Sequence, residues 1–178
     1  MVTANHINCP TIVLYLECSV GAYATAFLSR KLSEPDERHF QLADRLITYV
    51  KDTSTKCVTF HKLNWRECQL SVVSDASHAA TRDEFKSQTG YLIVLHDSKK
   101  TNLLAWKSSR QSKHAASSMA AECFAAQVAW QHGLYVRDLI KDFTPASKQT
   151  LKVNFVTDND DLYKVIKSGN AKYPRTKA

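Results

Sequence analysis

Glycine and proline are scarce in this chain, with four of each among 178 residues. Collagen-like and low-complexity chains are much richer in these two residues, so the composition excludes both classes. Apolar residues make up 44% of the chain, which is typical of a globular protein. A chain of this length can bury one substantial hydrophobic core. We therefore expect one folded domain with room for a small additional segment.

Cysteines are few, and no C-x-x-C pair occurs among the five. An odd number of widely spaced cysteines predicts reduced thiols in an intracellular protein, in either a cytoplasmic particle or the nucleus. Cys57 and His61 lie four residues apart, and Cys68 follows. A structural zinc site would need a fourth ligand and closer pairing. We therefore favour buried or incidental thiols over zinc.

A long uninterrupted apolar run is also absent. The most apolar stretch is TIVLYLECSVGAYATAFL (residues 11–28), in which Glu17 breaks the run and before which no Lys or Arg occurs. A secretory signal has a basic start, and a membrane-spanning helix needs about 20 apolar residues. We therefore predict a partly buried helix here, in a soluble protein without a membrane partner.

Acidic residues are outnumbered, because 24 Lys and Arg face 17 Asp and Glu and give a net charge of +7. A basic chain favours a polyanionic partner such as nucleic acid. One acid-free stretch, residues 99–114, is basic and contains a tryptophan, and a second basic stretch covers residues 162–178. In the first we predict nucleic-acid binding by Lys99, Lys100, Trp106, Lys107, Arg110 and Lys113. The alternative is a solvated basic surface without a ligand.

Hydrophobic periodicity predicts the order of helices and strands. Leu42, Leu46 and Val50 recur at helical spacing, in a helix that Ser33 or Glu34 can cap. The expected elements are, in order, a helix at 33–53, strands at 56–63, 69–75, 90–96 and 101–109, a helix at 117–143, a strand at 151–158 and a helix at 161–169. This order predicts a mixed α/β sheet. It divides the chain into a helical segment at 1–55 and an α/β domain at 56–178.

Three acids stand in apolar surroundings on three separate predicted elements. Asp75 and Asp158 each close an apolar strand, in SVVSD and NFVTD, and Glu122 is the lone acid of MAAECFAA in the long helix. Desolvating a carboxylate is costly unless a partner offsets the cost. Magnesium prefers oxygen ligands and supports phosphodiester hydrolysis, so these acids are candidate metal ligands. The alternatives are strand-end Asp residues that cap turns and a helix Glu that pairs with an Arg.

Four short motifs follow one another along the chain: KSQTGY (86–91), AWKSSRQS (105–112), SSMAAEC (117–123) and TDN (157–159). In this order, together with Asp75 in SDAS, they resemble the ribonuclease H domain of copia-type LTR retrotransposon polyproteins. The segment at residues 26–53 is similar to the one that connects the reverse transcriptase to that domain. The resemblance covers nearly the whole chain.

The resemblance implies a ribonuclease H-like fold, in which three antiparallel strands are followed by a helix, a strand and a helix. It implies that Asp75, Glu122 and Asp158 are catalytic and bind two Mg²⁺ ions, which Mn²⁺ can replace, with no organic cofactor. The implied activity is hydrolysis of the RNA strand of RNA/DNA hybrids during reverse transcription. The implied partners are the hybrid and the reverse transcriptase domain of the same polyprotein, which residues 1–55 would follow.

The sequence departs from this family pattern at several positions. Ala120 replaces the first glutamate of a double-Glu motif, Ser77 replaces the second acid of an Asp-Ala-Asp segment, and His78 replaces a tryptophan. No acid follows Asp161, whereas the family has a fourth carboxylate after the segment that YPRTKA resembles. We therefore expect a C-terminally truncated domain. The alternative function is that of a catalytically inactive, retrotransposon-derived remnant or nucleic-acid-binding module.

Overall fold

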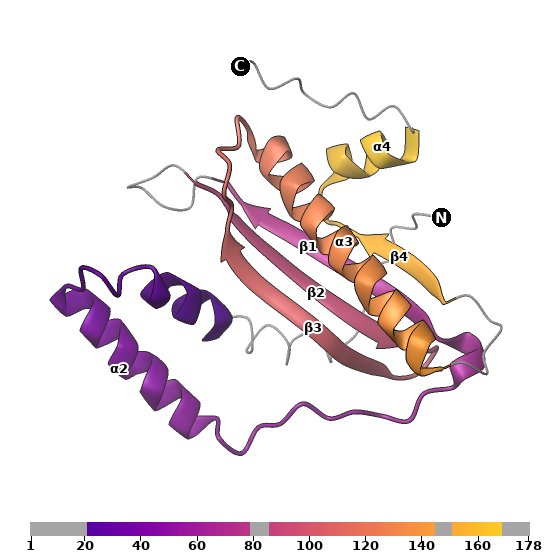
Figure 1. Ribbon diagram of the computed structural model, residues 1–178, viewed down its shortest axis with the longest axis horizontal. Helices are drawn as coiled ribbons and strands as arrows, with labels where there is room; N and C mark the ends of the chain where they lie inside the picture. Colours follow the sequence, from indigo (N-terminus) through magenta and orange to yellow (C-terminus); the bar gives the residue numbers. More distant parts are fainter. Residues whose placement is uncertain (1–20, 79–85, 145–150, 169–178) are drawn as a thin grey trace.

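The computed structural model describes residues 21–78, 86–144 and 151–168. A four-stranded mixed sheet in the order β3-β2-β1-β4 is covered on one face by the long helix α3 (Figure 1). The elements of this α/β body are β1 (Gln69–Ser77), β2 (Gln88–His96), β3 (Thr101–Arg110), α3 (Ser118–Phe143), β4 (Lys152–Val156) and α4 (Asp160–Ser168). β1, β2 and β3 are antiparallel, and β4 runs parallel to β1. The predicted order of a ribonuclease H-like fold is confirmed.

The core of the body lies between α3 and the sheet. Leu70, Val72 and Ile93 are fully buried in it. Apart from Glu122, the buried residues of α3 are all alanine or glycine, so the helix axis can approach the strands closely. The approach is close at Gly133, where an added Cβ atom would overlap Cγ2 of Val72. This packing fixes α3 relative to the strand ends that carry the candidate site.

The pairing of β2 with β3 decides which side chains of β3 face α3. Tyr91 on β2 faces α3, because its hydroxyl bonds to Nδ1 of His132 on that helix. Lys107 lies opposite Tyr91 in the antiparallel ladder, and opposed side chains share one face of a sheet. Because side chains alternate along a strand, Lys107 and Ser109 face α3, whereas Trp106 faces the other side.

A helical arm, residues 21–55, precedes the body. Residues 21–29 are helical, and α2 (Glu37–Asp52) follows them. No residue of α2 is buried, and α2 packs against none of the strands or helices of the body (Figure 1). A ring contact of 5.7 Å joins Phe27 to His39 within the arm. Arg30 Nη1 donates to Gln88 Oε1 on β2 at 3.4 Å and so links the arm to the sheet.

The predicted strand at residues 56–63 is wrong, because the chain there pairs with no strand. A side chain replaces the neighbouring strand instead. The His61 backbone N–H donates to Asn102 Oδ1 at 2.7 Å, and Asn102 Nδ2 donates to the His61 carbonyl at 2.9 Å. The segment therefore satisfies this part of its backbone without joining the sheet.

The predicted start of the arm helix is also wrong, because Asp36 caps α2 rather than Ser33 or Glu34. The Asp36 carboxylate accepts the backbone N–H of His39 at 3.1 Å, and His39 Nδ1 accepts the backbone N–H of Asp36 at 2.9 Å. This reciprocal pair is a capping box in which histidine takes the place of the usual Glu or Gln.

The predicted N-terminal helix lies only partly within the described residues. Residues 21–28 are helical, whereas residues 11–20 lie outside the described part of the chain, as do Cys9 and Cys18. No described helix is long and apolar enough to cross a membrane. Cys57, Cys68 and Cys123 are free thiols.

Candidate metal centre

Asp75 lies where β1 loses one of its neighbours. β4 pairs with β1 only as far as Val73, which lies opposite Val156. Beyond that point β1 pairs on this side with no strand of the described residues, and the Ala76 N–H hydrogen-bonds to the carboxylate of Glu122 on α3. Asp75 itself is exposed, so its carboxylate can reach a ligand from solvent.

Glu122 lies near the start of α3, where a cap fixes the beginning of the helix. Ser117 is the N-cap, and its Oγ accepts the Ala120 N–H at 3.1 Å. The Glu122 side chain is only 5% exposed, and its Oε2 atom has no hydrogen-bond partner. Burial, then the negative charge of Asp75, raises the pKa of Glu122 to about 6, against a partly compensating hydrogen bond from the Ala76 N–H and with a smaller contribution from Asp158.

Asp158 follows β4 in a turn that leads directly into α4. Thr157 Oγ1 accepts the Asn159 N–H at 3.2 Å, and Asn159 Oδ1 accepts the Leu162 N–H at 2.9 Å. These two bonds bracket Asp158 and fix the backbone on both sides of it. Asp158 is exposed, like Asp75.

The fold brings these three carboxylates together. One oxygen of each of Asp75, Glu122 and Asp158 lies within 4.8 Å of the other two. An all-oxygen set of carboxylates suits Mg²⁺ or Mn²⁺ rather than zinc. The buried, unpaired Oε2 of Glu122 fits such an ion, because a cation would supply the missing partner and offset the repulsion among three negative groups.

The sequence-based alternative of a zinc site gains no geometric support. The Asp75, Glu122 and Asp158 group is the only set of three such ligands that meet among the described residues. Cys68 is buried, whereas Cys57 and His61 are exposed.

Sequence reasoning missed two contacts that shape the centre. One is the hydrogen bond from the Ala76 backbone, which no side-chain pattern indicates. The other joins His78 Nε2 to the Ala115 carbonyl at 3.2 Å, so the end of β1 is tied to the loop before α3. The histidine was visible in the sequence, but its backbone partner was not.

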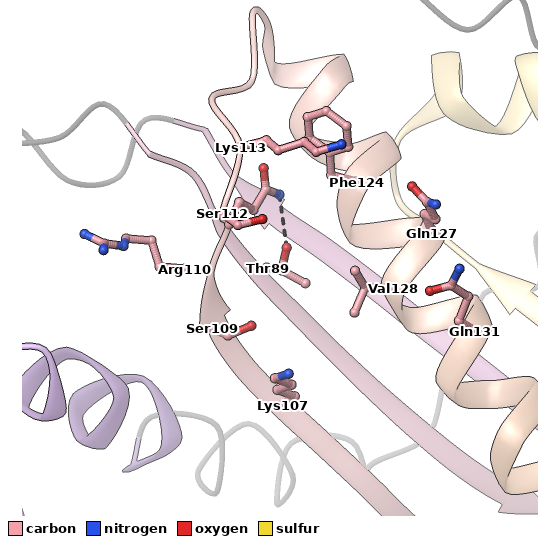
Figure 2. Close-up of a pocket in the computed structure, with 11 residues that line it drawn as sticks. Thr89, Lys107, Ser109, Arg110, Ser112, Lys113, Phe124, Gln127, Val128 and Gln131 are labelled. Atoms are coloured by element: carbon pink, nitrogen blue, oxygen red, sulfur yellow. Dashed lines mark hydrogen bonds between the residues drawn. The ribbon is translucent and has the colours of Figure 1, made fainter.

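The six predicted nucleic-acid-binding residues are not all together. Lys107, Arg110 and Lys113 line a pocket between β3 and α3 (Figure 2). Lys99 and Lys100 belong to the turn between β2 and β3, at the other end of a ten-residue strand that spans roughly 30 Å. Trp106 is 45% exposed on the sheet face opposite α3. Of the second basic stretch, residues 169–178 lie outside the described part of the chain.

Comparisons with known proteins find similarity to transposon proteins. It is 34% identical over 74 residues to a putative transposon Ty5-1 protein of Saccharomyces cerevisiae, covering 42% of this chain and 23% of that protein. It is 26% identical over 121 residues to the retrovirus-related Pol polyprotein from transposon TNT 1-94 of Nicotiana tabacum, covering 68% of this chain and 9% of the polyprotein. The chain thus spans less than a quarter of the length of these two relatives. It is similar to a region of retrotransposon Pol polyproteins.

Another relative is named as a secreted effector rather than as a transposon protein. Secreted RxLR effector protein 161 of Plasmopara viticola is 29% identical over 115 residues, which cover 65% of this chain and 77% of that protein. No protein-family model matches the chain, and no solved structure matches it.

Proposed function

We propose that the chain is a ribonuclease H-type endonuclease that hydrolyses the RNA strand of RNA/DNA hybrids during reverse transcription of a retrotransposon. The observation that carries the proposal is the convergence of Asp75, Glu122 and Asp158 within 4.8 Å. The order of strands and helices that positions them supports the same activity. The similarity to Pol polyproteins supplies the biological setting.

Asp75, Glu122 and Asp158 would hold Mg²⁺, which when bound supplies a Lewis acid that stabilises negative charge on phosphate oxygens. Glu122 acts as the buried anchor of the set, since α3 and the Ala76 N–H fix its position. Asp75 and Asp158 are exposed, so a phosphodiester can approach the centre from their side. The three carboxylates are negative themselves, so they would act on the phosphate by positioning the cation, and water rather than a side chain would be the nucleophile.

The proposed substrate is consistent with the charge of the chain. A net charge of +7 attracts a polyanion, and an RNA/DNA hybrid is recognised through its phosphates, its groove shape and the 2′-hydroxyls of its RNA strand. The proposed protein partner is the reverse transcriptase part of the same polyprotein, since the matched region is a small part of each transposon relative.

The test is cleavage of a hybrid labelled on the RNA strand, with Mg²⁺ or Mn²⁺ and with EDTA as the metal-free control. We expect cleavage by the parent chain and a loss of at least 100-fold in Asp75→Asn. The matched control is Asp44→Asn, which changes an exposed acid in α2 and should cleave like the parent. Cleavage that survives Asp75→Asn would contradict the proposed centre.

A second candidate is a nucleic-acid-binding module without catalytic activity. The observation that favours it is that three carboxylates, rather than the four of the resembling family, meet among the described residues. This candidate predicts salt-sensitive binding of the hybrid by a folded chain, with no cleavage in either metal. The cleavage test therefore separates the two functions.

A further inference from the structure

The groove between β3 and α3 has the chemistry of an anion site. Its volume is about 260 Å³, and among the described residues that line it none is acidic. Lys107 on β3 and Lys113 just after the strand supply positive charge to the groove, and Ser109 and Ser112 supply hydroxyls. Figure 2 shows Lys113 extending toward Phe124 on α3, whereas Arg110 points away from that helix.

Side-chain hydrogen bonds fix the floor of this groove. Gln111 is 7% exposed, and its Nε2 donates to Thr89 Oγ1 at 3.0 Å and to the Ala121 carbonyl at 2.9 Å. These bonds tie the end of β3 to β2 and to α3. The walls of the groove therefore keep their spacing, and a ligand would meet a preformed site.

Neutral donors complete the groove opposite the lysines. Gln127 and Gln131 project from α3 and line it. Lysine binds phosphate as a point charge, and amide N–H₂ and hydroxyl groups can donate to the remaining phosphate oxygens. A phosphodiester is matched by this set, whereas a cation or an apolar ligand is not.

The groove lies on the other side of α3 from the carboxylates. Residues of an α-helix follow one another every 100° or so, so Gln127 and Gln131 are about 140° and 180° around α3 from Glu122. Gln127 and Gln131 also lie five and nine residues farther along α3 than Glu122, which is about 7.5 and 13.5 Å at 1.5 Å per residue, and a helix is about 10–12 Å across with its side chains. The two places are therefore about 12–18 Å apart, or about four to five base-pair steps of a duplex at roughly 3.4 Å each. A nucleic acid lying obliquely across the first part of α3 could occupy both places.

We propose that this groove binds one backbone phosphate of the nucleic-acid substrate, a few steps from the phosphate that would react at the candidate metal centre. The inference rests on the proposed function for the identity of the substrate. It assigns Lys107, Lys113 and Gln127 as contacts, and it leaves Arg110 outside the site. The phosphate can come from the RNA strand or from the DNA strand, and the experiment distinguishes the two.

The experiment measures hybrid binding without cleavage, by fluorescence anisotropy of an end-labelled hybrid in EDTA at several salt concentrations. We expect Lys107→Ala/Lys113→Ala to raise Kd at least 10-fold at low salt and to reduce the slope of log K against log salt by between about 1 and 2. Gln127→Ala should raise Kd severalfold with the slope unchanged, since it removes no charge.

The matched control is Lys51→Ala/Lys141→Ala, which removes the same charge from exposed positions of α2 and of the far end of α3. We expect its Kd to change less than twofold. The thermal midpoint of each variant is measured and should equal that of the parent, since every substituted side chain is exposed. Binding by the groove variant that equals binding by this control would overturn the proposal.

The strand is identified by single neutral methylphosphonates placed one at a time along the RNA or the DNA. At one position in one strand, the substitution should weaken binding to the parent but not to Lys107→Ala/Lys113→Ala. If no position in either strand behaves so, the groove holds no backbone phosphate. Because the readout is binding, failure of cleavage would overturn the nuclease alone, and normal binding by the groove variant would overturn the groove alone.

Discussion

The helical arm and the α/β body use similar apolar residues in opposite ways. In the body, Ile93 and Leu70 are completely buried between α3 and the sheet. In the arm, Phe40, Ile47 and Val50 of α2 are each more than half exposed. Burial of apolar surface is the main favourable term in folding, so the body contains its own source of stability and α2 does not. An amphipathic sequence therefore specifies a helix without specifying what covers it.

The largest expected effect comes from replacing an isoleucine by alanine in each of the two regions. Ile93→Ala removes a fully buried side chain and should destabilise the chain by about 3–4 kcal/mol. Ile47→Ala changes a side chain that is 52% exposed and should change the free energy of unfolding by at most about 0.5 kcal/mol. Urea unfolding followed by tryptophan fluorescence measures both. Equal losses would show that the arm is covered in solution as fully as the core.

Two glycines, one in each region, test the comparison with smaller expected changes in free energy. Gly133→Ala puts a Cβ against Val72, and the overpacking should outweigh the gain in helix propensity and cost about 1–2 kcal/mol net. Gly21→Ala meets open space and should stabilise its helix by up to about 1 kcal/mol.

Denaturant midpoints measure the first change, and amide hydrogen exchange measures the second. The control for the close contact is Val72→Ala, in whose background Gly133→Ala should cost less than in the parent. Additive effects of Val72→Ala and Gly133→Ala would mean that the predicted overlap is relieved elsewhere.

The order of elements in the body could be predicted because each has strong local signals. The long helix follows from an Ala-rich stretch without proline, and it begins within one residue of the predicted start, after an N-cap at Ser117 that was not predicted. The strand at 56–63 could not be excluded, because alternating apolar residues indicate an extended chain and not a pairing partner. Its real partner is the side chain of Asn102, which is about 40 residues away in sequence.

The candidate site shows the same division between local and long-range information. Asp75, Glu122 and Asp158 stood out because each is an acid in an apolar context, and the fold brings them together. The basic stretch from Lys99 to Lys113 is continuous in sequence, yet an extended strand separates its ends and alternation divides it between two faces. A stretch that is continuous in sequence is thus divided between separate surfaces of the structure, and whether these surfaces bind nucleic acid stays a prediction.

The ionised carboxylate of Glu122 lowers the stability of the body, in contrast to the apolar residues of the core. Folded Glu122 has a pKa of about 6 against an ordinary value of 4.5, so the folded state binds this proton more tightly than the unfolded state. The contribution of Glu122 to stability should therefore be largest below pH 4.5 and should be lost as the pH rises through about 6. In EDTA at pH 8, Glu122→Gln should be more stable than the parent by about 1–2 kcal/mol.

This gain should shrink at pH 5, where the parent carboxyl is largely protonated in the folded state. Thermal unfolding at the two pH values, with and without Mg²⁺, measures the effect. Mg²⁺ should raise the midpoint of the parent more than that of Glu122→Gln. A variant that is less stable than the parent in EDTA at pH 8 would show that the carboxylate is satisfied without a cation.

The smallest effect should be confined to the arm. Asp36→Ala removes the capping box of α2 and should weaken the first turn of that helix by about 1 kcal/mol, whereas Asp36→Asn keeps a good cap and serves as the control. Hydrogen exchange should become faster for the first amides of α2 in Asp36→Ala only, and the urea midpoint of the body should stay unchanged. A midpoint that falls together with the protection of α2 would mean that the arm and the body unfold as one unit, in spite of the small number of contacts that join them.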